Sequence, residues 1–364
     1  MTGTTLAGDT ARAWVDIDLG ALLRNGEALA RLARVPLLPM VKADAYGLGA
    51  TAVARALTKL DPLGFGVATV AEGRELRAAG VDRRIIVFTP LLPADFPGAR
   101  AAGLTPTLAD PFAIAAWADS GGGAWHLAVD TGMNRAGVRF DEIGTVTDIV
   151  RRSPPEGAFT HFHSSEHGDG SMEQQDARFR DFIAALPARP ALLHADNSGA
   201  IVRRPASQPN PWSFVRPGVF LYGVGSGPGA LVTPEPVVRV AARVVEERLA
   251  LAGDVVGYDG TFKALRDTRV ATLAIGYADG YRRSLGNRGV VLVNGARARV
   301  IGMVTMDMTM IDVTGIPCRI GDTVTLIGAD GTASVTAEDA ASACALSPYE
   351  ILTGLRQRLP RRYT

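Results

Sequence analysis

The chain has 364 residues, and its 38 Lys and Arg against 37 Asp and Glu give a formal net charge of +1. This balance gives no electrostatic reason to expect a nucleic acid or an anionic membrane as partner, so a small molecule is the expected one. The length exceeds that of a usual single domain and predicts one large domain plus a smaller one.

The cysteine count and the hydropathy pattern predict a soluble, cytoplasmic protein. Cys318 and Cys344 are too few for a disulfide framework and lack metal-ligand spacing, so no metal site is expected. Residues 1–12 lack the apolar core of a signal peptide, and no segment reaches the roughly 18 uncharged apolar residues of a spanning helix.

From about Val35 to Gly223, short apolar runs alternate with segments of helical pattern, which predicts repeated βα units and a parallel sheet. The expected helices include Gly49–Leu57, Val70–Ala79 and Phe179–Leu186. Eight strands are predicted, at Leu37–Val41, Gly64–Ala68, Arg84–Phe88, Leu104–Thr107, His126–Val129, Gly157–His161, Ala191–His194 and Val219–Tyr222.

Eight such units predict an α/β fold, a (β/α)8 TIM-type barrel whose active site lies where the strands run into their following loops. Polar residues occupy those positions: Lys42 follows the first run, His161 closes the sixth and His194 the seventh. Each alone could be a structural group, but several at one barrel mouth indicate a site.

After Thr233 the sequence changes to Val-rich runs broken by glycine, which predict a mostly antiparallel β domain. The runs are Val237–Val245, Arg269–Ala274, Val290–Val293, Ala298–Val304, Met308–Val313 and Thr323–Gly328. The expected domains are therefore a barrel at residues 13–232 and a β domain at 233–364, with a first strand at 13–18 that can instead join the β domain.

Lys42 ends an apolar run in the segment VKADAYGLGA at residues 41–50. A lysine in an apolar cleft has a lowered pKa because burial disfavours the ammonium, and the neutral amine can condense with an aldehyde. From spacing alone, a solvated lysine at the start of a loop is the alternative.

The segment VKADAYGLGA resembles the cofactor-lysine motif of alanine racemases, and seven further segments resemble that family in the same order. They are THF at 160–162, HADNSGA at 194–200, VRPGVFLYG at 215–223, GYDGTF at 257–262, AIGYADGYRR at 274–283, MDMTMIDVT at 306–314 and YEIL at 349–352. The resemblance covers nearly the whole chain.

The resemblance implies an amino-acid racemase that interconverts L- and D-alanine with pyridoxal 5'-phosphate as cofactor. It also implies a homodimer in which each β domain contributes to the partner's site. Lys42 would bind the cofactor and act as one base, and Tyr258 would be the second base on the opposite face. Inversion needs a proton removed from one face and returned to the other, which two bases supply.

Further roles follow from the same resemblance. Arg216 would face the pyridine nitrogen and donate a hydrogen bond to it, because a guanidinium has donors only. His161 would lie near the cofactor ring, although His163 and His167 are close in sequence, and His194 and Asn197 would position other contacts. The implied phosphate contacts are Tyr46, Ser198, Gly218, Val219 and Tyr349.

Arg135 resembles the arginine that binds the substrate carboxylate, and Tyr277, Met306 and Asp307 resemble residues at the substrate entrance. The chain departs from the family at Ala128, where many members carry a carbamylated lysine that orients this arginine. The other departures are Asp259, Met303, Thr305 and Met308. They put the substrate in doubt more than the type of reaction.

Three alternatives stay open. The first is a racemase for serine or a broader set of amino acids. The second is another barrel-type pyridoxal enzyme, such as a decarboxylase or a D-amino-acid dehydratase, although no histidine follows His194 to form the metal pair of such a dehydratase with Cys344. The third is a non-catalytic pyridoxal-binding protein, which would lack the second domain.

Overall fold

The structure is a computed structural model that describes residues 11–205 and 209–364. The chain divides into two compact units. One unit combines the described residues up to Ala21 with Tyr46–Gly49 and Pro236–Thr364, and the other combines Leu22–Ala45 with Ala50–Glu235. We call them the β unit and the barrel unit.

The barrel unit is built on a parallel sheet in the order β2-β3-β4-β5-β7-β8, with β6 paired to β5. Its strands are β2 Gly64–Val67, β3 Arg84–Val87, β4 Thr105–Leu108, β5 His126–Asp130, β6 Val138–Arg139, β7 Gly157–Phe159 and β8 Leu192–His194. Strands β2 and β4 are buried along their whole length. This burial on both faces is typical of parallel strands covered by helices.

Two irregular segments complete the barrel between β8 and β2. Leu37 bridges Val215 and Met40 bridges Gly66, both in parallel orientation. On the other side, Ser213 N–H donates to Leu193 O at 2.7 Å, which joins residues 213–217 to β8. Six of the eight predicted strands are present. The first, Leu37–Val41, forms only two isolated bridges, and the eighth is wrong, because Val219–Tyr222 forms a 3-10 helix, η4.

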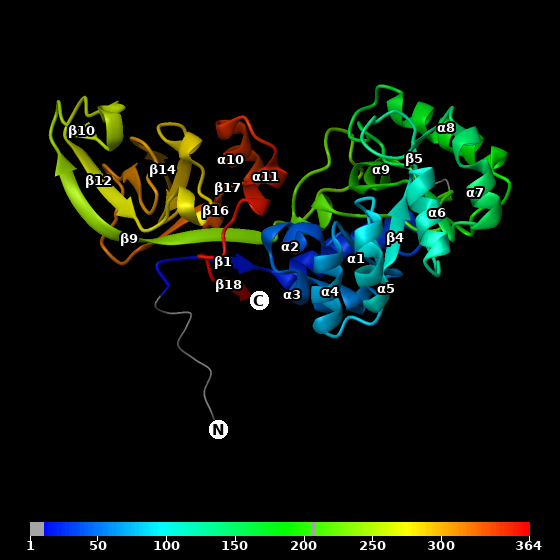
Figure 1. Cartoon of the computed structure of the whole chain (residues 1–364). Helices are drawn as coiled ribbons and strands as arrows, with labels where there is room; N and C mark the ends of the chain where they lie inside the picture. The colour runs from blue at the N-terminus through cyan, green and yellow to red at the C-terminus, as the bar shows by residue number, and fades with distance from the viewer. Residues whose placement is uncertain (1–10, 206–208) are drawn as a thin grey trace. The chain divides into compact units, whose positions relative to one another are not determined.

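Helices follow the strands and cover the outside of the sheet, as α4 and α5 do beside β3 and β4 (Figure 1). They are α1 Leu19–Ala33, α3 Ala50–Leu57, α4 Val70–Ala78, α5 Phe96–Ala101, α6 Pro111–Asp119, α7 Thr147–Arg152, α8 Ser171–Ala185 and α9 Ser198–Arg203, with short 3-10 turns η1 Thr58–Leu60, η2 Pro93–Asp95 and η3 Ile143–Thr145. The helices predicted from sequence are present as α3, α4 and α8.

The β unit contains a nine-stranded sheet in the order β17-β16-β13-β14-β15-β12-β9-β1-β18, and a further β16–β9 pairing closes six of these strands into a ring. The strands are β1 Ala13–Ile17, β9 Val238–Ala250, β12 Thr268–Leu273, β13 Val290–Val293, β14 Ala296–Val300, β15 Thr309–Asp312, β16 Thr323–Asp330, β17 Ala333–Val335 and β18 Arg361–Tyr363, with a separate hairpin of β10 Val255–Val256 and β11 Phe262–Lys263.

All pairings in the nine-stranded sheet are antiparallel except that of β1 with β18. Strand β1 at residues 13–17 pairs with β9 and so lies in this unit. The remaining elements are η5 Tyr258–Gly260, η6 Tyr277–Asp279, η7 Arg283–Leu285, α10 Ala337–Cys344 and α11 Pro348–Thr353. Helix α11, the last helix, ends at Thr353.

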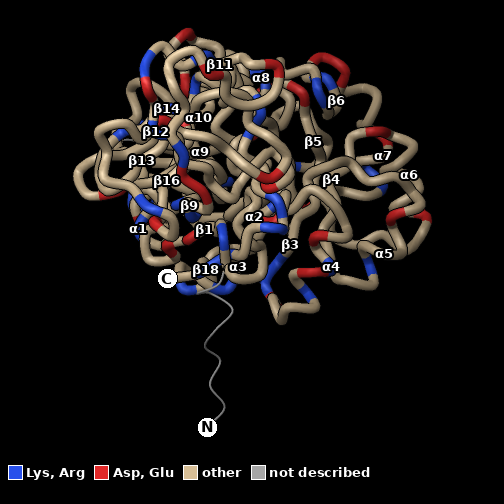
Figure 2. Tube along the Cα trace, turned by 90° about the vertical axis from the view of Figure 1, so that its left-hand side faces the viewer, with Lys and Arg blue, Asp and Glu red and all other residues tan. Residues whose placement is uncertain are grey.

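Acidic and basic residues are interspersed along the chain in both units, in keeping with the balanced charge (Figure 2). In the described ranges, the helices all fall short of the length and apolar character needed to cross a membrane.

The glycines at 47 and 49 follow Lys42 and have positive φ angles of 85° and 95°. A Cβ atom added at Gly49 would lie 2.0 Å from the Tyr363 hydroxyl oxygen, within the same unit. Gly80 has a similar φ of 86° but nothing within 4 Å of an added Cβ. A substitution at Gly80 therefore meets backbone strain alone, whereas one at Gly49 meets strain and a steric clash.

We therefore expect Gly49→Ala to destabilise the protein more than Gly80→Ala does. Both variants adopt a strained backbone, which costs about 1–3 kcal/mol, and only Gly49→Ala must also displace Tyr363. Urea unfolding of the two variants measures this difference, and equal unfolding midpoints would contradict the proposed contact.

Candidate active site

Lys42 begins α2, Lys42–Gly47, which is a left-handed turn. Four non-glycine residues in succession, Ala43 to Tyr46, have φ between 52° and 57°. Each L-residue in this conformation costs about 1–2 kcal/mol, so surrounding contacts must hold the turn in place.

Within the barrel unit, Glu72 of α4 holds the start of this turn. Its Oε1 accepts a hydrogen bond from Ala43 N–H at 2.8 Å, and its Oε2 accepts one from Ala68 N–H at 2.7 Å. The carboxylate thus joins the loop after Lys42 to the loop after β2. On the preceding side, the Tyr222 hydroxyl donates to Met40 O at 2.7 Å and fixes the segment that leads into Lys42.

Within the β unit, the C-terminal strand holds the end of the same turn. Arg361 donates from Nη2 to Gly47 O at 2.9 Å, and the Tyr363 hydroxyl donates to Leu48 O at 3.1 Å. Tyr46 is partly buried, and this burial together with Tyr349 raises its pKa to about 12. Tyr46 and Tyr349, both implied phosphate contacts, are therefore near each other in this unit.

Burial, followed by the charges of Arg135 and Arg216, lowers the pKa of Lys42, while Glu72 opposes the shift. The lysine is therefore neutral over a wider pH range than an exposed one. The same two arginines act on His161, whose pKa burial lowers to about 3. Lys42, Arg135, His161 and Arg216 form one electrostatic cluster at the ends of the barrel strands.

Arg216 lies in the barrel interior with 3% of its surface exposed. Its Nη1 donates to His194 Nδ1 at 2.7 Å, and its Nη2 donates to Thr160 O at 2.8 Å and Ala195 O at 2.9 Å. The Nη2 atom is also 3.4 Å from His161 Nδ1, so His161 lies beside this arginine together with His194. Among the described residues, its Nε makes no hydrogen bond, so this donor is available.

Three further predicted residues converge where β8 and residues 213–217 end. Ser198 Oγ accepts hydrogen bonds from Gly218 N–H at 2.9 Å and Phe220 N–H at 3.4 Å. The third of these residues, after Ser198 and Gly218, is Val219, which begins η4. Asn197 caps α9 by accepting from Ala200 N–H at 3.1 Å and also accepts from the Ser165 hydroxyl at 2.7 Å. This group of hydroxyl and backbone N–H donors suits an anion.

Arg135 lies on the loop between β5 and β6, which closes on itself because Asp130 pairs with Arg139. The arginine is exposed and has no hydrogen bond or ion pair to residues 11–205 or 209–364. Ala128, seven residues earlier on β5, is buried and offers it no acceptor. The sequence did not reveal what supports this loop.

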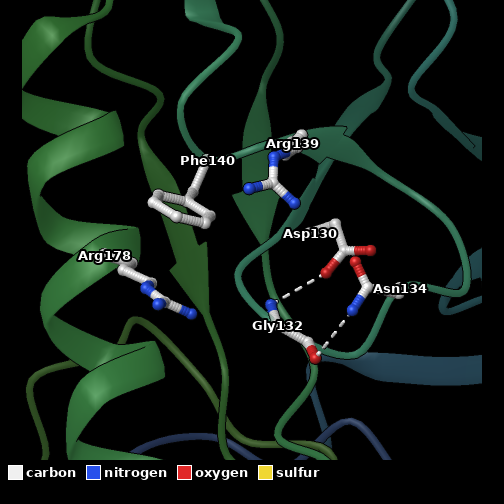
Figure 3. A pocket seen from close by; sticks show the side chains of 6 residues that line it. All are labelled: Asp130, Gly132, Asn134, Arg139, Phe140 and Arg178. Carbon is white, nitrogen blue, oxygen red and sulfur yellow. Dashed lines mark hydrogen bonds between the residues drawn. The ribbon is translucent and has the colours of Figure 1, made fainter.

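A pocket of about 200 Å³ lies against the same loop and shows part of that support (Figure 3). The Arg178 guanidinium stacks on the Phe140 ring at 4.3 Å, and its Nη1 donates to Thr131 O at 2.9 Å. Asp130 Oδ1 accepts from Gly132 N–H at 2.8 Å. The lining residues are Asp130, Gly132, Asn134, Arg139, Phe140 and Arg178.

The remaining predicted residues lie in the β unit. Tyr258 is in η5 and is 68% exposed, while Tyr277 and Met306 are 40% and 53% exposed. Tyr277 N–H donates to Thr305 O at 2.9 Å, so η6 and the 305–308 turn are neighbours. Asp307 accepts from Arg358 Nη2 at 2.8 Å, a partner that sequence reasoning missed.

Glu72 was also missed from the sequence, and its role is open to a direct test. We expect Glu72→Ala to lower stability by about 1 kcal/mol, because an exposed and a partly buried backbone N–H group lose a charged acceptor. Hydrogen exchange should show faster exchange of the Ala43 and Ala68 amides. Glu75→Ala, an exposed carboxylate on the same helix, is the control, and unchanged exchange in Glu72→Ala would contradict this role.

Comparison with known proteins gives matches over nearly the whole chain. Residues 17–226 match the family described as alanine racemase, N-terminal domain, and residues 237–363 match alanine racemase, C-terminal domain. The alanine racemase of Symbiobacterium thermophilum is 36% identical, with 96% of each chain covered.

Solved structures give the same result. The chain is similar to alanine racemase from E. faecalis, with a TM-score of 0.90, 31% identity, and 99% and 100% of the two chains covered. It is also similar to alanine racemase from Bartonella henselae with covalently bound pyridoxal phosphate, with a TM-score of 0.89, 30% identity, and 97% and 100% covered.

Proposed function

The chain belongs to the alanine racemase family, and we propose that it interconverts L- and D-alanine by proton transfer at Lys42 and Tyr258. As a member of that family it is a pyridoxal-phosphate-dependent isomerase. The observation that carries the assignment is the match of both domains over almost the full length. A non-catalytic pyridoxal-binding protein would resemble the barrel alone.

The residues of the barrel unit fit pyridoxal phosphate. Lys42 has an amine whose pKa is lowered, as covalent attachment to an aldehyde requires. Arg216 keeps Nε available for the ring nitrogen. Ser198 Oγ accepts from Gly218 N–H and still has its own proton to donate to the phosphate, beside Val219. When bound, the cofactor withdraws electrons from the substrate Cα and so acidifies its proton.

The residues then divide the proton transfer between two faces. The Lys42 amine would hold or accept the proton on one face, and the Tyr258 hydroxyl would do so on the other. Arg135 would bind the substrate carboxylate with its fork of donors. His161, with a pKa lowered to about 3, stays neutral and adds no charge beside the ring.

A homodimer is the second part of the proposal. Tyr258, Tyr277, Met306 and Met308 are all between 40% and 68% exposed in the β unit, an unusual gathering of large apolar side chains. A second copy of the chain would cover them and would receive Tyr258 in its barrel. The domain roles follow: residues 13–232 bind the cofactor and 233–364 complete the partner's site.

Alanine is the expected substrate, and serine or a broader set of amino acids is the alternative that Met303, Thr305 and Met308 leave open. A cytoplasmic location also stays a prediction. Incubating enantiopure amino acids with the protein, followed by chiral chromatography, tests reaction and substrate together. Retention of configuration across the panel would reject the proposed function.

We expect Lys42→Ala to abolish racemisation and the absorbance of the lysine-bound cofactor, because the imine needs this amine. Borohydride reduction followed by peptide mass analysis locates the attachment. Glu235→Gln, a substitution in an exposed ion pair with Arg24, is the control. A reducible covalent adduct that persists in Lys42→Ala would assign the cofactor to a different residue.

Shared sites predict complementation between inactive chains. Lys42→Ala and Tyr258→Phe should each be inactive as homodimers, whereas the mixed dimer has one site with both bases intact. Mixing the two should therefore restore activity, up to about half per mixed dimer because only one site of two is complete. Mass spectrometry verifies subunit exchange, and exchange without recovery would mean that each site forms within one chain.

A further inference from the structure

Arg216 donates to a chain of buried histidines whose proton positions can be deduced. A guanidinium has donors only, so His194 Nδ1, 2.7 Å from Arg216 Nη1, must be an acceptor without a proton. Burial, followed by the charge of Arg216, holds the pKa of His194 well below its usual value, so the ring is neutral. Its one proton is therefore on Nε2.

The next link follows from this tautomer. His194 Nε2 lies 2.8 Å from His126 Nδ1. Because Nε2 carries the proton, His194 donates and His126 Nδ1 accepts. Burial lowers the pKa of His126, against the opposing effect of Glu156, so its ring is neutral as well. The proton of His126 is then on Nε2.

The chain ends near a carboxylate at the opposite end of the strands. His126 Nε2 is buried without a hydrogen-bond partner in the described part of the chain, and Glu156 Oε2 lies 3.7 Å away, an electrostatic contact longer than a hydrogen bond. Glu156 also forms an ion pair with Arg84, which donates from Nη2 to Oε1 at 2.8 Å. His126 and then Arg84 lower the pKa of Glu156 to about 2, so it is an anion at neutral pH.

Packing fixes both rings in the planes that this chain needs. The His194 ring is stacked between Phe214, with centroids 4.2 Å apart, and Phe159, with centroids 5.1 Å apart. His126 lies against the backbone of Gly157, where an added Cβ would be 2.4 Å from its ring. A larger residue at 157 would push His126 aside, so β7 is built to admit this ring.

Starting from the proposed function, we propose that Glu156 and His126 are positioning residues that act on the cofactor through Arg216. In this chain of side chains, each N–H group donates in the direction from Arg216 toward Glu156. The anion polarises both imidazoles in sequence and places electron density on the acceptor of Arg216 Nη1. Asp196 also raises the pKa of Arg216 through its charge, without a hydrogen bond to the guanidinium, and the histidine chain adds an oriented acceptor. The chain thereby orients Arg216 and sets how strongly its Nε donates.

The first test needs no variant and no turnover. The protein has five histidines, so ¹⁵N-histidine labelling gives few ring signals to assign. In the holoenzyme we expect His194 and His126 to be neutral with their protons on Nε2, and to stay so across the pH range in which the fold is stable. A proton on Nδ1 of either ring would reverse a link and overturn the proposal.

The second test uses two variants of the holoenzyme. Glu156→Gln removes the charge but keeps the shape, and His126→Phe breaks the chain. We expect both to lower kcat by about ten- to a hundredfold, as for partners that orient a functional group, with the KM for alanine little changed. The ¹⁵N signals of His194 should shift in both, together with the cofactor absorbance maximum.

Two matched controls separate this role from packing. Glu235→Gln removes a carboxylate from an exposed ion pair in the same unit, and Trp125→Phe alters the buried neighbour of His126. Unchanged kcat and His194 signals in folded Glu156→Gln would overturn the proposal, even if His126→Phe does not fold. An inactive wild-type chain with the expected tautomers would instead reject the proposed function alone.

Discussion

A positive charge that cannot be removed sits inside the barrel, and much of the site is arranged around it. Arg216 is 3% exposed, and burial lowers its pKa only to about 9, so the guanidinium stays charged at neutral pH. The polar interior follows from this constraint. Two carbonyl oxygens and a neutral imidazole accept hydrogen bonds from the guanidinium. Its charge also contributes to the lowered pKa values of Lys42 and His161.

The second constraint is conformational. The left-handed turn after Lys42 costs several kcal/mol if each of its four residues contributes about 1–2 kcal/mol. Its first residue, Ala43, donates to Glu72, and Gly47, after its last residue, accepts from Arg361. Strain of this kind persists where the surroundings over-determine it.

Periodicity was sufficient to predict the βα units and the β-rich half, because each strand and helix buries a face of fixed spacing. It failed at Val219–Tyr222, where an apolar run forms η4 and the irregular residues 213–217 take the eighth position. Resemblance supplied the predicted site residues. It did not supply Glu72, His126, Glu156 or Arg358, whose partners are distant in sequence and emerge only when the chain is folded.

The chain has Ala128 where the family resemblance implies a lysine beside Arg135. Support for the loop comes from beneath it instead. Gln175 of α8 donates to the Thr131 hydroxyl at 3.2 Å and to His161 O at 3.1 Å, and Arg178 donates to Thr131 O. These bonds tie the start of the Arg135 loop to the segment that carries His161. The start of this loop is therefore held by hydrogen bonds of its own, although position 128 carries no lysine.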